Sequence, residues 1–318
     1  MTDSNQEALV SIGVPTFNGE KTIRRTLLSL IGQRYTNIEI IVSDDGSTDD
    51  TCRICEEFAN QDPRIKFFPH QNNRGAVWNF NYVLGQATGE FFFWCGQDDV
   101  RLADYVEKCV EKLSQNPKAV YCHSLYQDLI GDESKVRAVR SVSSLVAIPS
   151  KMDRFMRAYQ SGIGSTGFYG IYRLNVVKPK LLWQNFIGSD NCIFNAVLLE
   201  GDIEEVPEVL FKYYGRDAVR DKFEHSRFLS PGNRKKRLFF PYLLFIKKCL
   251  GVVWRSSLTK AQKCVLASRI IGYECLNIAT KLFYKLSRRI VGVSRANDLL
   301  RSMGREDLIP LNVGYKDR

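Results

Sequence analysis

The chain has 318 residues, of which 44% are hydrophobic and 25% charged, a balance that excludes a largely disordered or fibrous protein. Its length fits one α/β catalytic domain with an additional segment. The formal net charge is +10, but residues 1–130 carry −6 and residues 231–318 carry +14. The basic character therefore belongs to the C-terminal region, where it suits an anionic surface such as phospholipid headgroups or nucleic acid.

Apolar runs alternate with helical patterns through the first 125 residues. The apolar runs predict strands at residues 9–14, 38–42, 65–68, 91–95 and 119–125. Helices are predicted at about 50–60, 74–87 and 102–115, and Asn18 is placed to cap an earlier helix that contains Ile23 and Leu27. Strands that alternate with helices at this spacing indicate βαβ units and a mostly parallel sheet.

The rest of the chain has a weaker pattern. Residues 130–150 and 161–170 are interpreted as loops, and a helix at about 190–200 and a strand at 206–213 follow. After Pro231 the pattern is helical, with Lys and Arg interleaved among apolar residues. The most apolar stretch, 238–254, is interrupted by Pro and Lys and is too short to predict a membrane span, and the polar N-terminus does not predict a signal peptide.

Nine scattered cysteines indicate reduced thiols and a cytosolic compartment. Cys52 and Cys55 form the one close pair in the sequence, but a structural zinc would require a second pair at similar spacing. We interpret them as two helix cysteines.

Polar clusters follow three of the predicted strands, at residues 15–18, 44–47 and 97–99. Ligands of parallel sheets bind beyond the carboxyl ends of the strands, so these clusters are expected to meet at one edge. The adjacent carboxylates of Asp98 and Asp99 repel each other, and Mg²⁺ or Mn²⁺ bound by oxygen ligands would relieve the repulsion. Each cluster alone also fits a helix N-cap or a turn, but two acidic clusters at neighbouring strand ends favour one shared site.

Taken in order, four segments resemble the motifs of the family-2 glycosyltransferases: residues 10–18, 40–49, 73–75 and 89–99. The resemblance covers about residues 8–215. It implies the GT-A fold, an α/β architecture with a nucleotide-binding mixed, mostly parallel sheet flanked by helices, and transfer of a sugar from a nucleotide donor with inversion. The domains expected from it are a glycosyltransferase domain at 1–230, with a nucleotide-binding half at about 8–125 and an acceptor half at 126–230, and a basic helical region at 231–318.

The resemblance also implies how the nucleotide is bound. Pro15, Thr16 and Phe17 are expected to line the pocket of the nucleobase and ribose. Asp45 is expected to accept a hydrogen bond from the N3–H of a uracil-type base, while Asp44 orients the loop.

Further residues are assigned to the diphosphate and the metal by the same resemblance. Arg74 matches a position near the base or the diphosphate, and Asp98 and Asp99 occupy the acidic motif that binds the metal and the donor. Gly96 stands where many relatives carry the first Asp of that motif, which leaves the division of labour between Asp98 and Asp99 open.

Inverting transfer needs a carboxylate that deprotonates the acceptor hydroxyl. Asp190, in the segment 187–190 ahead of a helical pattern, resembles the residue that supplies this base, although the spacing also fits an N-cap. Asp153, Asp202 and Asp217 are alternatives for the base. His225 is either a further metal ligand or a solvated surface residue.

The Gln-x-x-Arg-Trp motif of processive family members is absent, which indicates addition of a single sugar. We therefore predict a cytoplasmic, metal-dependent, inverting glycosyltransferase. It is expected to move one sugar from a UDP- or dTDP-sugar to a lipid-linked or surface-polysaccharide acceptor, a glycan or glycolipid. Gly96 makes a noncatalytic sugar-nucleotide binder an alternative.

The basic C-terminal region has two interpretations. Residues 234–240 and 281–286 place Lys and Arg beside aromatic residues, a pattern typical of helices that bind the inner face of a membrane peripherally. A solvated basic face is the alternative. Nucleic-acid binding is disfavoured, because the region lacks a known binding motif and the first 130 residues are acidic.

Overall fold

The structure is a computed structural model that describes residues 7–130, 135–163, 167–178, 188–215 and 241–305. Contacts within the chain divide it into two compact units, residues 1–258 and 259–318. Strands and helices of the first unit are, in chain order, β1 (Val10–Thr16), α1 (Ile23–Ile31), β2 (Ile38–Asp44), α2 (Thr51–Gln61), β3 (Ile65–Pro69), α3 (Ala76–Gln86), β4 (Phe91–Trp94), β5 (Val100–Arg101), α4 (Tyr105–Gln115), β6 (Ala119–Ile130), β7 (Val136–Arg140), α5 (Ser143–Val146), α6 (Lys151–Ser161), β8 (Ile171–Arg173), α8 (Leu174–Val177), α9 (Ser189–Val197), β9 (Asp202–Gly215) and α11 (Pro241–Arg255).

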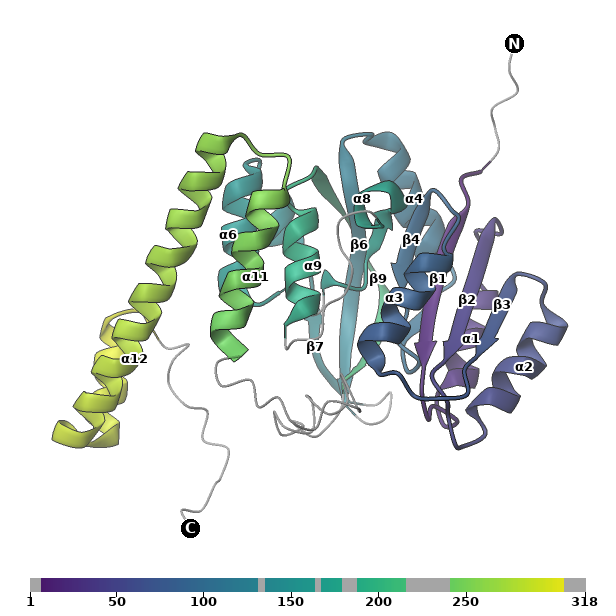
Figure 1. Cartoon of the computed structure of the whole chain (residues 1–318), viewed down its shortest axis with the longest axis horizontal. Helices are drawn as coiled ribbons and strands as arrows, with labels where there is room; N and C mark the ends of the chain where they lie inside the picture. Colours follow the sequence, from purple (N-terminus) through teal and green to yellow (C-terminus); the bar gives the residue numbers. More distant parts are fainter. Residues whose placement is uncertain (1–6, 131–134, 164–166, 179–187, 216–240, 306–318) are drawn as a thin grey trace. The chain divides into compact units, whose positions relative to one another are not determined.

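Within the described residues the strands form one nine-stranded sheet, with helices on both faces (Figure 1). The strand order is β3-β2-β1-β4-β8-β6-β9-β5, and β7 pairs with β6. β3, β2, β1 and β4 are parallel, β8 is antiparallel to β4 and β6, and β9 runs parallel to β6. The mixed α/β sheet flanked by helices confirms the predicted architecture.

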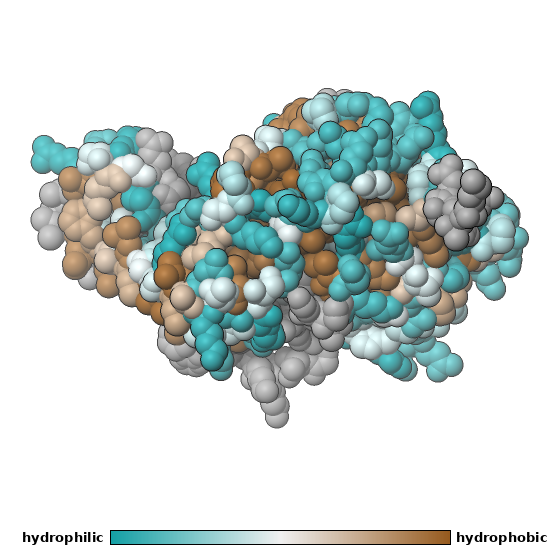
Figure 2. All heavy atoms as spheres, turned by 90° about the horizontal axis from the view of Figure 1, so that it is seen from above, coloured by the Kyte–Doolittle hydropathy of each residue, from teal (hydrophilic) through white to brown (hydrophobic). Residues whose placement is uncertain are grey.

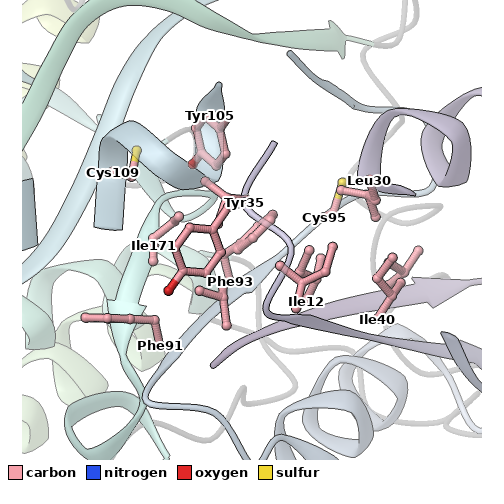
Figure 3. Close-up of a cluster of buried hydrophobic side chains, with 14 of the residues drawn as sticks. Ile12, Leu30, Tyr35, Ile40, Phe91, Phe93, Cys95, Tyr105, Cys109 and Ile171 are labelled. Atoms are coloured by element: carbon pink, nitrogen blue, oxygen red, sulfur yellow. The ribbon is translucent and has the colours of Figure 1, made fainter. Parts of the chain in front are cut away.

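β1, β2 and β4 are buried on both faces, which explains their nearly continuous apolar sequences. On one face Ile12, Ile40 and Phe93 pack against Leu30 of α1 and Tyr105 of α4 (Figure 3). On the other face Trp94 stacks on Phe168 with 4.4 Å between ring centroids. Alternate side chains of β4 thus supply aromatic rings to both layers, and each large buried side chain stabilises the fold by about 1.5–3 kcal/mol.

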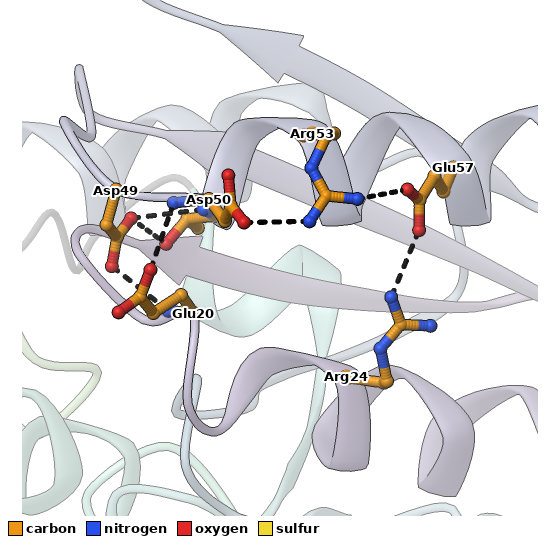
Figure 4. Close-up of polar contacts among 7 residues, drawn as sticks. Glu20, Arg24, Asp49, Asp50, Arg53 and Glu57 are labelled. Carbon is orange, nitrogen blue, oxygen red and sulfur yellow. Dashed lines mark hydrogen bonds and ion pairs between the residues drawn. The ribbon is translucent and has the colours of Figure 1, made fainter.

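Ion pairs and hydrogen bonds connect the loop after β1 to α2 (Figure 4). Arg53 binds Asp50 and Glu57, and Arg24 of α1 binds Glu57 at 3.0 Å. At the other end of this network the amide of Asp50 donates to Glu20 at 3.2 Å. Exposed ion pairs contribute little stability each, so the main effect of this network is to hold the loops after β1 and β2 together.

Several expectations from the sequence are wrong in detail. Asn18 does not cap α1, whose N-cap is Thr22; its Oδ1 atom instead accepts from the amide of Thr48 at 2.9 Å. The chain after Asp98 and Asp99 forms the short strand β5 before α4 begins, because it pairs with β9. Strands β7 and β8 and helices α5 and α6 occupy segments for which no element was expected.

The expected domain boundary near residue 230 lies outside the described residues. α11, which we expected in the C-terminal region, belongs to the first unit and packs on α9 and α6. Phe245 of α11 contacts Gly188 and stacks on Tyr159 of α6, with ring centroids 5.6 Å apart.

The second unit is built on the long helix α12 (Lys260–Ser302), as the helical pattern predicted. Thr259 and Gln262 form a reciprocal capping box at its start. Among the helices that the structure describes, none is both long and apolar enough to cross a membrane.

Candidate functional site

Three loops meet beyond the carboxyl ends of β1, β2 and β4. Asn79 of α3 joins the first two, because its Nδ2 atom donates to the carbonyl groups of Thr16 at 3.1 Å and Ser43 at 2.9 Å. Gln97 joins the loop after β4 to β1: its Oε1 atom accepts from the Thr16 hydroxyl at 2.7 Å and from the Phe17 amide at 2.8 Å. The strand ends that the sequence marked therefore share one edge of the sheet.

The two carboxylates after β2 are both engaged with backbone groups. Asp44 accepts hydrogen bonds from the amide and the hydroxyl of Ser47, which fixes the turn after β2. Asp45 is 1% exposed, and its two oxygens accept from the amides of Arg74 and Gly75 at 2.8 Å each. Burial raises the pKa of Asp45 against the opposing effect of these two hydrogen bonds. Asp45 thereby holds the loop before α3 against β2.

Arg74 belongs to an aromatic cluster that sequence reasoning missed. Its guanidinium lies over the ring of Trp78, 4.5 Å from the centroid. The Trp78 ring contacts the rings of His70 and Tyr82, whose centroids lie 4.7 and 5.0 Å from its own. Burial, and then the charge of Arg74, lower the pKa of His70. The i, i+4 spacing of Trp78 and Tyr82 was the available signal, since such residues share one helix face, and Arg74 lies just before that helix.

Asp98 and Asp99 do not cap a helix; they lie between β4 and β5. Asp99 is 1% exposed, and neither of its carboxylate oxygens has a hydrogen-bond partner among the described residues. Arg101 Nη1 lies 4.0 Å from one of them. Burial, followed by the negative charge of Asp98, raises the pKa of Asp99, while Arg101 opposes the rise.

The surroundings of these carboxylates fit a divalent cation. A β-carbon on Gly96 would lie 2.9 Å from Asp99 Oδ2 and 3.0 Å from Asp98 Oδ1, so both side chains turn toward a space that only glycine leaves open. No group of three or more His, Cys, Asp or Glu residues that could hold a metal occurs in the described part of the chain. A cation here would thus have two protein carboxylates, as Mg²⁺ and Mn²⁺ sites completed by phosphate and water often do.

Arg25 of α1 supplies a cationic group beside Asp98 and Asp99, the acid pair. It donates to the carbonyl of Asp98 at 3.0 Å, and its guanidinium lies 3.8 Å from the ring centroid of Tyr214. No motif in the sequence marked Arg25, because its role depends on pairing between distant strands.

Asp190 lies in the first turn of α9 and is not its N-cap, which is Gly188. Gly188 has φ of +87°, a left-handed conformation that favours glycine and turns the chain into the helix. The Oδ1 atom of Asp190 accepts from the amide of Asn191 at 2.9 Å. The sequence also allowed Asp190 to be an N-cap, and the structure shows that it is not.

Two of the alternatives to Asp190 lie at the opposite edge of the sheet. Asp202 begins β9, opposite Ala119 at the start of β6, and its carboxylate is 3.7 Å from Arg154 Nη2. Asp153 precedes Arg154 in α6 and is exposed. Asp217 and His225, together with residues 234–237, lie outside the described residues.

Tyr169 and Tyr213 form a contacting pair of aromatic rings. Their ring centroids are 6.0 Å apart. Burial is the main cause that raises the pKa of both hydroxyls, and Asp98, Asp99 and Asp190 all raise these pKa values further. Carboxylates from segments about 90 residues apart in the sequence thus both act electrostatically on one tyrosine pair.

A mixed α/β sheet with polar loops and paired carboxylates beyond its strand ends defines a class of nucleotide-binding proteins. The model of Glycosyl transferase family 2 matches residues 11–178, more than half of the sequence, and the chain belongs to this family.

Individual relatives agree with this assignment. The GalNAc(5)-diNAcBac-PP-undecaprenol beta-1,3-glucosyltransferase of Campylobacter jejuni is 31% identical over 182 residues, which are 57% of each chain. The chondroitin synthase of Escherichia coli is 35% identical over 108 residues, 34% of this chain and 16% of that protein. The chain therefore spans little more than half of the first relative and a smaller part of the second.

Among solved structures, residues 1–349 of S. aureus TarS in complex with UDP-GlcNAc superimpose with a TM-score of 0.60. The match covers 94% of this chain and 83% of that chain at 20% identity. At this identity the likeness shows the shared fold, which confirms the expected GT-A architecture.

Proposed function

We propose that the chain is an inverting glycosyltransferase that transfers one sugar from a nucleotide-sugar donor, a UDP- or dTDP-sugar, to a glycan or glycolipid acceptor. The observation that carries the proposal is the meeting of the loops after β1, β2 and β4 at one edge of the sheet, where Asp98 and Asp99 both lie against Gly96. A donor that spans this edge would have its diphosphate near one carboxylate group and its anomeric carbon within reach of another.

Asp190 is proposed as the general base. Inversion requires the acceptor hydroxyl to attack the anomeric carbon from the face opposite the leaving diphosphate, so the base must stand apart from the residues that hold that diphosphate. Asp190 comes from α9, whereas Asp98 and Asp99 come from the loop after β4. Its carboxylate takes the proton of the hydroxyl as the new glycosidic bond forms and the bond to the diphosphate breaks.

Asp98 and Asp99 are proposed to hold Mn²⁺ or Mg²⁺. Such a cation, when bound, offsets the negative charge of the departing nucleoside diphosphate. Arg25 lies beside the same loop, and its charge favours the anionic donor there.

The nucleotide is proposed to bind along the loops after β1 and β2. Pro15, Thr16 and Phe17 would face the base and ribose, and Arg74 would contact the base or the diphosphate. A hydrogen bond from the base to Asp45 would use lone pairs that the amides of Arg74 and Gly75 leave available.

The acceptor is proposed to be lipid-linked, with the enzyme in the cytoplasm and peripheral on the inner face of the membrane. The C. jejuni relative is named for an undecaprenol-linked substrate. In this chain α12 exposes large apolar side chains, such as Leu282 (57%) and Leu286 (58%), while Glu274 on the same helix is buried. Figure 2 shows hydrophobic residues gathered on the surface over α12. Together with neighbouring Lys281, such a surface suits an anionic bilayer.

The test is turnover of labelled sugar nucleotides. UDP-, dTDP- and GDP-sugars are incubated with the protein and Mn²⁺, with and without a polyprenyl-diphosphate glycan, and release of the nucleotide is followed. Release that depends on the acceptor would support the proposal. Tight binding of a sugar nucleotide without any release would instead support the noncatalytic binder.

A further inference from the structure

Tyr213 stands next to the acid pair because of the pairing between β5 and β9. The two strands are antiparallel, with Val100 opposite Lys212 and Arg101 opposite Phe211. One step further, the same register sets Asp99 beside Tyr213. Since side chains alternate along a strand, Tyr213 lies on the same face of β9 as Phe211, and Lys212 lies on the other.

Tyr169 reaches the same place from the turn before β8, and a buried arginine holds it there. Its carbonyl oxygen accepts hydrogen bonds from Arg101 Nη2 at 3.3 Å and from the Tyr105 hydroxyl at 3.1 Å. Arg101 is itself fixed, because its guanidinium lies 3.5 Å from the ring centroid of Phe211. The Tyr169 ring contacts the rings of Phe211 and Tyr213, with centroids 6.3 and 6.0 Å away.

The two rings are therefore positioned before any ligand arrives. Both tyrosines are only partly buried, so part of each residue remains accessible. The hydroxyl group of each tyrosine can donate a hydrogen bond. A partly exposed, rigid pair of aromatic rings with hydroxyl donors suits a ligand with an apolar C–H face and polar edges, which is the chemistry of a pyranose sugar.

We propose that Tyr169 and Tyr213 form the floor on which the donor's sugar ring rests. This inference depends on the proposed function, in which Asp98 and Asp99 hold the diphosphate. The sugar of a nucleotide donor is bonded directly to that diphosphate, so it must lie beside the acid pair, where Tyr213 is found. The acceptor has to approach the anomeric carbon from the side opposite the diphosphate, so the tyrosine pair, which lies beside the acid pair, is assigned to the donor sugar.

The experiment compares the affinity of UDP with that of UDP-GlcNAc and UDP-glucose, each with Mn²⁺, by calorimetry. The variants are Tyr213→Leu, Tyr169→Leu and Tyr213→Phe, which removes only the hydroxyl. Because UDP lacks the sugar, it reports whether the fold and the nucleotide site survive in each variant. Lys212→Ala is the matched control, since it changes the neighbouring residue on the other face of β9.

The Leu variants are expected to bind UDP within twofold of the wild type. Their affinity for the preferred sugar nucleotide should fall roughly three- to tenfold, the range expected for loss of aromatic contacts. Leu variants that bind both ligands like the wild type would overturn this inference while leaving the proposed function intact. A wild-type protein that binds none of these nucleotides with Mn²⁺ would overturn the proposed function and the tyrosine floor with it.

Discussion

The Cα atom of Gly96 faces the carboxylate of Asp99 so closely that an added β-carbon would lie 2.9 Å from Oδ2. The same β-carbon would lie 3.0 Å from Oδ1 of Asp98. These separations are shorter than ordinary contacts between carbon and oxygen, so at least one carboxylate would have to move. Gly96 is thus a steric condition for the present positions of both Asp side chains.

Gly96→Ala is therefore expected to weaken Mn²⁺-dependent binding of UDP by about tenfold or more, since a shift of either carboxylate disturbs the metal site. Calorimetric titration of UDP with and without Mn²⁺ measures the effect. Gly85→Ala in α3 is the control, because a β-carbon there meets no atom within 4 Å. Equal metal dependence in both variants would contradict the proposed place of the cation.

UDP is expected to stabilise the protein only when Mn²⁺ or Mg²⁺ is present, because the cation proposed at Asp98 and Asp99 would hold the diphosphate. At a hundredfold excess over Kd, the nucleotide should add about 2.7 kcal/mol to the free energy of unfolding. Thermal unfolding with UDP in Mn²⁺ and in EDTA measures the difference. Asp98→Asn and Asp99→Asn should lose the metal-dependent part, whereas Asp153→Asn should keep it. Equal shifts of Tm in Mn²⁺ and EDTA would remove the metal from the donor site.

Glu39 of β2 should make the stability of the fold sensitive to acid. Burial alone would raise the pKa of Glu39, but hydrogen bonds from Lys66, Ser11 and Thr88 outweigh it and lower the pKa to about 2. A lowered pKa contributes stability above the unfolded-state value near 4.5, and this contribution is lost as the pH falls toward 2. The full contribution at neutral pH is about 3 kcal/mol.

The measurement is the free energy of unfolding of the wild type and Glu39→Gln between pH 7 and pH 2. The difference between them should be largest at neutral pH and shrink below pH 4.5. Glu57→Gln, which removes an exposed partner of Arg24 and Arg53, is the control and should change little across the range. A gap that stays constant with pH would mean that Glu39 is not charged in the folded protein.

The parallel half of the sheet and its edge could be predicted because the signals there are local. β1, β2 and β4 are short and almost wholly apolar, and polar residues follow each one directly. Geometry then requires the loops after parallel strands to meet, as the contacts of Gln97 with Thr16 and Phe17 bear out. Local sequence was enough to find the edge.

The second half of the sheet depends on pairing between distant segments, which local patterns do not encode. β8 inserts between β4 and β6 although it follows them in the sequence, and β5 is too short to recognise without β9. Arg101 is fully buried among aromatic rings, whereas a sequence pattern would place an arginine at the surface. Tyr169 and Tyr213 were missed for the same reason, since only the assembled sheet brings them to the acid pair.

The exposed apolar face of α12 should bind anionic membranes. Replacing Leu282 and Leu286 with Ser removes about half or more of the apolar area that these side chains could bury, and vesicle affinity should fall severalfold. Reversing Lys281 to Glu changes the charge by two units and should weaken binding by about 2 kcal/mol, and by less at high salt. Sedimentation with vesicles of phosphatidylglycerol and phosphatidylcholine measures both effects.

Vesicles of phosphatidylcholine alone are the control for the electrostatic part. Binding to anionic vesicles that is unchanged by the Ser replacements and insensitive to ionic strength would mean that α12 is covered by something other than lipid. In that case sedimentation equilibrium of the wild type and the Ser variant would show whether a second copy covers it.

Asp190→Asn should greatly slow sugar transfer while leaving donor binding intact. The amide keeps the size of the side chain and can still accept a hydrogen bond from Asn191, but it cannot take the proton of the acceptor hydroxyl. Loss of a positioned base costs about 10²–10⁴-fold in rate. UDP affinity with Mn²⁺ should stay within twofold, because the proposed contacts of the nucleotide lie on the loops after β1, β2 and β4. Titration of UDP and the rate of sugar transfer, measured on one preparation, give the two numbers.

Asp202→Asn and Asp98→Asn complete the comparison. Asp202 pairs with Arg154 at the opposite edge of the sheet, so its replacement should leave the transfer rate near that of the wild type. Asp98→Asn should lose metal-dependent donor affinity as well as turnover, because this substitution removes a proposed ligand of the metal that both depend on. Near-normal transfer by Asp190→Asn would exclude it as the base and leave Asp217, which lies outside the described residues, as the next residue to replace. Loss of UDP affinity in Asp190→Asn would instead assign Asp190 to the donor site, since a base that touches only the acceptor cannot affect nucleotide binding.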